Sequence, residues 1–260
     1  SSAVHTLPNV TGELMPGKIA GTNFTGSLLV GHATTGTLSS AEYNTGVGIA
    51  ALDALTSGDY NTALGNSSGT AVTTGGENTL IGYGGGSAIT TSNYNVAVGR
   101  NSLSSVSTSS DGNTAIGRSA MKDSTAATYN TGIGMSALED TTGDYNIGIG
   151  SNAGDNITSG SGNIIIGTVD AGSATGSRQL KIAGYDGSTT TTWISGDSNG
   201  IVTFADDILI KDGGTIGSAS DADSISIAAN GVVTFSQTPV NSAGTAFSTE
   251  DPTALAIALG

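Results

Sequence analysis

One pentapeptide frame, Asn-x-x-aliphatic-Gly, recurs along the chain at a nearly constant spacing. Successive copies are separated by 17, 17, 17, 18, 17, 16 and 17 residues. The eight copies are Asn44–Gly48, Asn61–Gly65, Asn78–Gly82, Asn95–Gly99, Asn113–Gly117, Asn130–Gly134, Asn146–Gly150 and Asn163–Gly167. A fixed period is typical of repeat architectures, in which each unit packs mainly against its neighbours.

Two weaker copies extend the series at the same spacing, SLLVG ending at Gly31 and LKIAG ending at Gly184. Helical repeats need about 30 residues or more, whereas 17 residues hold two short strands and two turns. The sequence therefore predicts an all-β fold, a parallel β-roll or β-solenoid of about ten coils of ~17 residues over residues 27–184.

The composition fits an ordered repeat. Of the 260 residues 41 are Gly and 11% are charged, while the 36% that are hydrophobic recur at fixed places. Disordered chains usually combine low hydrophobicity with a high charge density, which is not the pattern here. The net charge of −14 disfavours binding to nucleic-acid phosphates. The chain contains no Cys, so neither disulfides nor thiolate metal sites are available.

Strand alternation suggests which positions of the repeat face inward. With the Asn as position 0, position 3 is always aliphatic, and position 1 lies on the same face, so we expect both inside the coil. Position 2 should then face outward, yet it is never polar: Gly46, Ala63, Leu80, Ala97, Ala115, Gly132, Gly148 and Ile165. A strand that is apolar on both faces is buried on both. We therefore predict that position 2 forms the interface of an intertwined homotrimer.

The recurrent Asn and Gly are interpreted as structural, because Gly permits a tight corner and stacked Asn side chains satisfy turn backbone groups. The tyrosine that often precedes the Asn could stack on a ligand, but a ring packed over the corner is the favoured interpretation. These tyrosines are Tyr43, Tyr60, Tyr94, Tyr129 and Tyr145.

The period fails after Gly184. Two related segments, Ile194–Phe204 and Ile225–Phe235, are offset by 31 residues, and each carries Asn-Gly before an alternating β run. We interpret 185–240 as a compact β module that is also trimeric, with Trp193, Phe204 and Phe235 in its core. Residues 1–26 are expected to form an extended attachment segment, and 241–260 a tail or connector.

The sequence offers little material for catalysis. The only histidines, His5 and His32, have no evident triad partners. Glycosidases need two carboxylates about 5 to 9.5 Å apart, and the acids here lie mainly in turns, where Asp is structurally favoured: Asp59, Asp111, Asp144 and Asp155. We predict no catalytic residues, although a polysaccharide depolymerase remains an alternative.

Binding motifs are equally sparse. The Asp221–Ser224 cluster could hold Ca²⁺, but no twelve-residue loop ending in Glu follows it. No run of about 18 apolar residues is present. We therefore predict no cofactor, no metal, no nucleic acid and no membrane insertion. Ice binding by a threonine ladder is disfavoured because position 1 is expected to point inward and is interrupted by Val96, Ile147 and Ile164.

The repeats resemble two known groups of proteins. NTAIGRSA at Asn113–Ala120 is similar to the head repeats of YadA-type trimeric autotransporter adhesins, although the coils are longer here. The YNTGVG coil at Tyr43–Gly48 and the downstream stretch Asp207–Ser236 resemble phage fibre proteins, especially those of marine phages.

This resemblance implies a left-handed roll in a homotrimeric, host-facing virion fibre without catalytic activity. Its expected partners are other virion proteins, through the chain ends, and a host receptor such as a glycan or an outer-membrane protein. The expected location is the virion surface. The alternatives are a bacterial trimeric adhesin head at the cell surface and a tailspike-like depolymerase.

Overall fold

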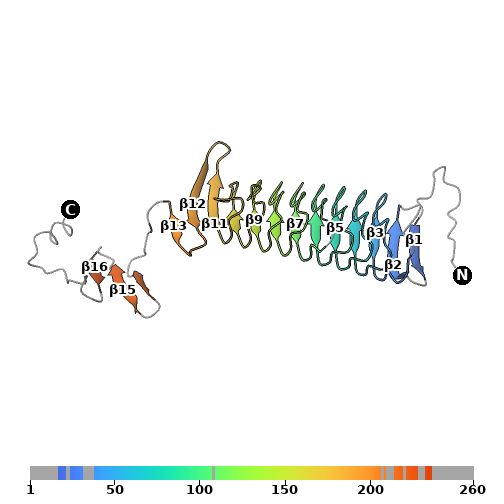
Figure 1. Ribbon diagram of the computed structural model, residues 1–260, viewed down its shortest axis with the longest axis horizontal. Helices are drawn as coiled ribbons and strands as arrows, with labels where there is room; N and C mark the ends of the chain where they lie inside the picture. The colour runs from blue at the N-terminus through green and yellow to red at the C-terminus, as the bar shows by residue number, and fades with distance from the viewer. Residues whose placement is uncertain are drawn as a thin grey trace, which may run out of the picture. The chain divides into compact units, whose positions relative to one another are not determined.

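The computed structural model describes residues 17–21, 24–31, 38–106, 109–205, 208, 214–218, 221–227 and 232–235. Every regular element in these residues is a β-strand. The chain divides into two compact units, Ser1–Ala205 and Asp206–Gly260. The predicted all-β solenoid is confirmed, and it lies in the first unit (Figure 1).

The first unit contains one sheet of thirteen strands in chain order. The strands are β1 (Gly17–Gly21), β2 (Phe24–Val30), β3 (Thr45–Val47), β4 (Thr62–Leu64), β5 (Thr79–Ile81), β6 (Val96–Val98), β7 (Thr114–Ile116), β8 (Thr131–Ile133), β9 (Ile147–Ile149), β10 (Ile164–Ile166), β11 (Leu180–Tyr185), β12 (Thr190–Gly196) and β13 (Val202–Phe204). Strands β2 to β11 are parallel and define nine turns of the solenoid. Each position of a full repeat pairs with the same position of the next.

Each coil carries one strand of three residues rather than the two short strands that its length suggested. The rest of the coil bends repeatedly through positive φ. In one coil these bends fall at Tyr60 (59°), Gly65 (135°), Ser67 (55°) and Gly69 (58°). Residues visit this region singly and in turns, so the segment after the Gly cannot form a second extended strand.

The repeat glycines form one axial row. A Cβ added to Gly82 would lie 2.5 Å from the carbonyl oxygen of Gly99, and the φ of Gly82 is +123°. The same backbone contact recurs from Gly48 to Gly150. Coil stacking therefore requires glycine here for two reasons, a left-handed backbone and close approach of the next coil.

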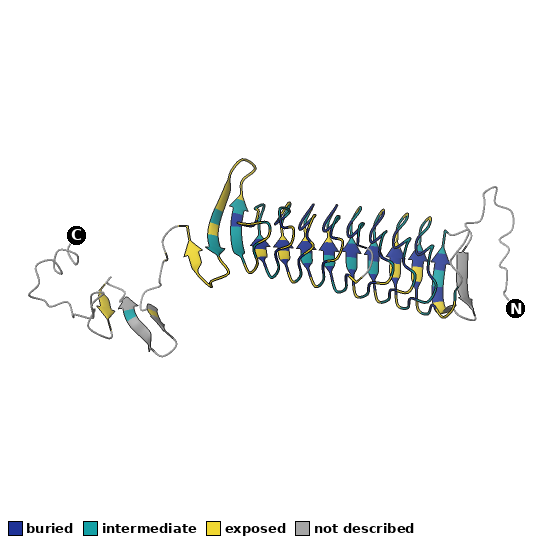
Figure 2. Cartoon of the chain, viewed as in Figure 1, coloured by how far each residue is buried: buried dark blue, intermediate teal, exposed yellow. Residues whose placement is uncertain are grey.

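Position 2 faces the solenoid interior, so the prediction that it forms an interface between chains is wrong. In each of β3 to β10 the middle residue is buried and its two neighbours are exposed or half-buried (Figure 2). All eight predicted interface residues are therefore interior residues of their own chain: Gly46, Ala63, Leu80, Ala97, Ala115, Gly132, Gly148 and Ile165. The opposite wall, which carries buried residues such as Leu52 and Leu55, leaves room for one inward side chain per strand.

Side-chain size in this interior is matched between neighbouring coils. Leu80 lies over Gly69 of the preceding coil, where an added Cβ would come within 2.6 Å of Leu80 Cδ1. The arrangement is reversed at Gly132, which faces Met121, and at Gly148, which faces Leu138. Large and small residues thus alternate across the interface between coils, which gives a close-packed core of narrow cross-section.

The repeat asparagines form a buried hydrogen-bonded ladder. The backbone N–H and Nδ2 of Asn61 donate to Asn44 Oδ1 at 2.9 and 3.0 Å. Asn61 Nδ2 also donates to the carbonyl of Gly75 at 2.9 Å, which ties the strand to the turn that closes the coil. Ser27 and Gln179 occupy the end rungs. Buried polar groups need such partners, and the ladder supplies them at every coil.

The last coil differs from the predicted register by one residue. Leu180 pairs with Ile164, so Gln179 takes the Asn position and Ala183, not Gly184, takes the Gly position. The Gln179 side-chain amide donates to Asn163 Oδ1 at 3.1 Å and so replaces the Asn amide of the ladder. An equivalent side-chain amide thus sets the register, whereas the spacing of the glycines predicts Gly184 at this place.

The predicted module 185–240 is divided between the two units. Strands β12 and β13 continue the solenoid sheet in antiparallel fashion, whereas the second unit contains β14 (Gly214–Ser218), β15 (Asp221–Ile227) and β16 (Val233–Phe235) in a separate antiparallel sheet. Trp193, Phe204 and Phe235 are about half exposed rather than buried in a core.

The predicted attachment segment 1–26 contains β1, which forms a hairpin with β2. Residues 1–16, His5 among them, lie outside the described residues, as do His32 and the predicted tail 241–260.

Candidate assembly face

Positions 1 and 3 of β3 to β10 form two parallel rows on the outer surface of the sheet, which together we term the apolar face. Position 1 contributes Thr45, Thr62, Thr79, Val96, Thr114, Thr131, Ile147 and Ile164, and position 3 contributes Val47, Leu64, Ile81, Val98, Ile116, Ile133, Ile149 and Ile166. None of the sixteen is charged. Leu64 is 50% exposed, Ile164 40% and Ile149 39%. Sequence reasoning placed these residues inside, so it missed this surface.

The apolar face continues beyond the regular coils. On β11 Ile182 pairs with Ile194, which pairs with Phe204 on β13. Directly paired residues share a face of the sheet, so Val202 and Phe204 continue the row and are 51% and 44% exposed. The sheet therefore presents aliphatic or aromatic side chains outward from β3 to β13.

The outward direction of position 1 also corrects the expectation about its threonines. They are exposed or half-buried, not inside the coil. The row remains interrupted by Val96, Ile147 and Ile164, and position 3 beside it is aliphatic throughout.

A row of tyrosines precedes the strands, at the edge of the apolar face. Tyr43 and Tyr60 stack with ring centroids 4.9 Å apart, and Tyr129 and Tyr145 stack at 5.3 Å. The ring of Tyr129 lies against Gly112, where an added Cβ would come within 2.7 Å of it. The rings thus pack over the corners of the coils while about half of each remains exposed.

The opposite edge of the face, at position 5, is mixed in character. Arg100 lies over the ring of Tyr83, with its guanidinium carbon 5.8 Å from the ring centroid. In the following coils Arg118 Nη2 contacts Met135 Sδ at 3.7 Å. These cations border the apolar face without entering it.

The turn carboxylates serve the backbone. Oδ1 of Asp59 accepts the N–H of Glu42 at 2.7 Å, and Oδ1 of Asp111 accepts that of Asn93 at 2.7 Å. Asp144 does the same for the N–H of Thr128. Each acceptor reaches the equivalent turn of the preceding coil, so these acids link coils and satisfy turn amides.

One carboxylate pair stands apart from this pattern. Burial, together with a hydrogen bond to Asp170, raises the pKa of Asp155 to about 6. Asn152 Nδ2 donates to Asp155 Oδ2 at 2.9 Å and acts in the opposite direction. The two carboxyls therefore share a hydrogen bond with each other rather than stand on either side of a space for substrate. Among the described residues, no group of three or more His, Cys, Asp or Glu side chains could hold a metal ion.

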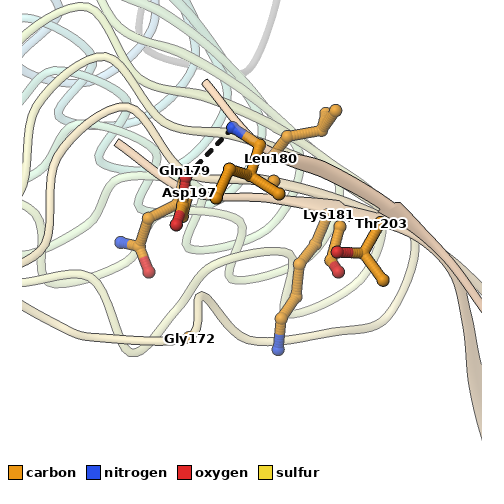
Figure 3. Close-up of a pocket in the computed structure, with 9 residues that line it drawn as sticks. Gly172, Gln179, Leu180, Lys181, Asp197 and Thr203 are labelled. Carbon is orange, nitrogen blue, oxygen red and sulfur yellow. Dashed lines mark hydrogen bonds between the residues drawn. The ribbon is translucent and has the colours of Figure 1, made fainter. Parts of the chain in front are cut away.

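A cavity of about 260 Å³ lies where the last coil of the solenoid meets strands β12 and β13 (Figure 3). It is lined by Gly172, Gln179, Leu180, Lys181, Ser195, Gly196, Asp197, Ile201 and Thr203. The Asp197 carboxylate accepts the backbone N–H of Ile201 and of Asn199, and these bonds lower its pKa. This carboxylate therefore fastens the β12–β13 turn, and the cavity brings no second carboxylate to it.

Comparison of the chain with protein-family models, with curated proteins and with solved structures finds no match. Within the part of the chain that the structure describes, no helix has the length and apolar character needed to span a bilayer.

Proposed function

We propose that the chain is a structural subunit of a homotrimeric virion fibre that attaches to a host surface and catalyses no reaction. The apolar face carries this proposal. Contiguous exposed apolar surface beyond a few hundred Å² marks interaction sites on soluble proteins. Here such surface follows strand after strand from β3 to β13 without a charged residue.

Other copies of the same chain are the partners that fit the apolar face best. Its side chains repeat with the strand spacing of about 4.8 Å. A second copy has the same repeat, so side chains that interdigitate at one coil interdigitate at all of them. A partner without this period could match only a few strands. Closed symmetry then buries the face on every copy.

Three copies suit a fibre better than two antiparallel ones. A fibre with one end on a particle and the other toward a host requires parallel chains. Three narrow sheets around one axis enclose their apolar faces in a prism, leaving the acidic turns outside. The net charge of −14 on each chain then keeps the assembly soluble.

We propose the absence of catalysis because the turn carboxylates have structural roles. Asp59, Asp111 and Asp144 hold backbone amides of neighbouring coils. The assignment to a virion rests on the resemblance of the coils and of the stretch Asp207–Ser236 to phage fibres.

Light scattering tests the assembly. The expected mass is three times the chain mass of 25.3 kDa. Ile133→Asp places a charge on the apolar face and should dissociate the trimer, because a buried unpaired charge is costly. The control, Ser159→Asp, lies in an exposed turn away from the face. A monomeric wild type, or an intact Ile133→Asp trimer, would refute the proposed interface.

Adsorption tests the biological role. Purified protein should compete with intact particles for attachment to host cells, and labelled antibodies should decorate a particle appendage in micrographs. Host polysaccharide should stay intact, and Asp111→Asn should leave competition unchanged. Release of oligosaccharides that depends on one carboxylate would instead assign a depolymerase.

A further inference from the structure

The second unit repeats the closing sheet of the solenoid. The sheet β14–β15–β16 has the strand order and the residue pairing of β11–β12–β13. A bulge interrupts the first strand pair at the same place in both, after Ile182 and after Ile216. Equivalent positions are Ile182 and Ile216, Ile194 and Ile225, Val202 and Val233, and Phe204 and Phe235.

The first hairpin of the second unit also matches the hairpin that starts the solenoid. Gly17 pairs with Val30 across β1–β2, and Gly214 pairs with Ile227 across β14–β15. In both hairpins two residues of sequence separate the strands, because β1 ends at Gly21 and β2 begins at Phe24, and β14 ends at Ser218 and β15 begins at Asp221. The second unit therefore combines the opening hairpin and the closing strand of the solenoid without coils between them.

The four equivalent positions are apolar in both sheets and remain accessible in the single chain. Val233 and Phe235 are each 50% exposed and Ile216 is 46% exposed. Thr234, which points to the opposite face of β16, is also exposed. Exposed aliphatic and aromatic residues gathered on one face of a sheet form the kind of patch that marks an interaction site. Their presence in both sheets indicates that the same kind of partner covers both.

In the first unit these positions belong to the apolar face, which the proposed function assigns to contact between copies. We propose that the second unit is an independent self-assembly module. Its sheet packs through Ile216, Ile225, Val233 and Phe235 against the same sheet of the other copies. The inference rests on the proposed homotrimer and adds a second contact to it. A three-stranded sheet needs a hydrophobic face to be stable in water, and packing that face against the same face of other copies buries it, which gives the physical reason.

Fluorescent labelling tests the module in the full chain, because the protein contains no cysteine. Val233→Cys is labelled with pyrene maleimide, and Thr234→Cys is the matched control on the other face of the same strand. Two pyrenes emit as an excimer only when they meet. We expect several-fold stronger excimer emission from Val233→Cys, abolished when labelled chains are refolded with excess unlabelled chain. Phe235→Cys provides a second site on the same face.

Ile149→Cys, on the solenoid, separates this inference from the proposed function. An excimer at residue 149 without one at residues 233 and 235 would overturn the module and leave the fibre standing. No excimer at any of the three would overturn both. An excimer at 233 and 235 alone would support the module and refute the solenoid interface.

Discussion

Removal of one rung of the asparagine ladder should destabilise the protein far more than removal of a surface amide. Asn78 is buried, and its Nδ2 donates to Asn61 Oδ1 at 2.9 Å and to the Ser92 carbonyl at 3.0 Å. Its Oδ1 accepts the backbone N–H and Nδ2 of Asn95 at 3.0 and 3.2 Å. Asn78→Ala therefore deprives the Asn95 N–H and the Ser92 carbonyl of partners that the interior does not replace.

A buried polar group left without a partner costs about 1–3 kcal/mol. Two such groups give an expected loss of about 2–6 kcal/mol in the free energy of unfolding. Asn66→Ala is the control, because Asn66 is exposed and a surface substitution usually changes stability by less than about 0.5 kcal/mol. The assay is urea unfolding followed by circular dichroism at one fixed chain concentration, since assembly contributes to stability. Equal losses for the two variants would refute the structural role assigned to the ladder.

Three further predictions follow from the same structure. The pKa of Asp155 is about 6 in the folded chain and about 4 when unfolded. Its contribution to stability is therefore present below pH 4 and is lost as the pH rises through 6. The melting temperature of Asp155→Asn should fall less between pH 4 and 7 than that of the wild type, and parallel profiles would contradict this. Gly99→Ala should lower the melting temperature much more than Gly187→Ala, since both have positive φ but only Gly99 faces a neighbouring carbonyl; equal shifts would show that strain alone matters. Gly148→Leu should be strongly destabilising, and Leu138→Gly in the same chain should recover part of the loss in a double-mutant cycle of denaturant unfolding; strict additivity would disprove the matched packing.

The candidate surface was only partly accessible to sequence reasoning. Alternation correctly separates position 2 from positions 1 and 3, but it does not say which set is inside when both are apolar. One signal in the sequence does distinguish them. Position 2 is small where the buried residue ten or eleven places earlier is large. Gly132 lies eleven residues after Met121, and Gly148 lies ten residues after Leu138. Reciprocal size indicates direct contact, so it identifies position 2 as interior.

The sequence by itself determined the coil. Its period sets the number of stacked strands, its glycines mark the corner where backbones touch, and its asparagines supply the buried ladder. These features are local to one repeat or to adjacent repeats, so a pattern of residue types is enough to reveal them. The prediction of two strands per coil is wrong because residues such as Ser67 and Leu138 have positive φ and so turn the chain. Neither Ser nor Leu is a residue type that marks a turn in the repeat pattern.

Only the tertiary structure decided which surface is exposed. A single strand of three residues has room for one inward side chain, because the facing wall already fills the interior with residues such as Leu52 and Leu138. The number of inward side chains depends on the width of the closed coil. That width is set by the backbone path of the complete coil and not by any one residue. The same holds for the last rung, where the hydrogen bond from Gln179 to Asn163, and not the position of Gly184, fixed the register. Inside and outside are therefore properties of the closed coil.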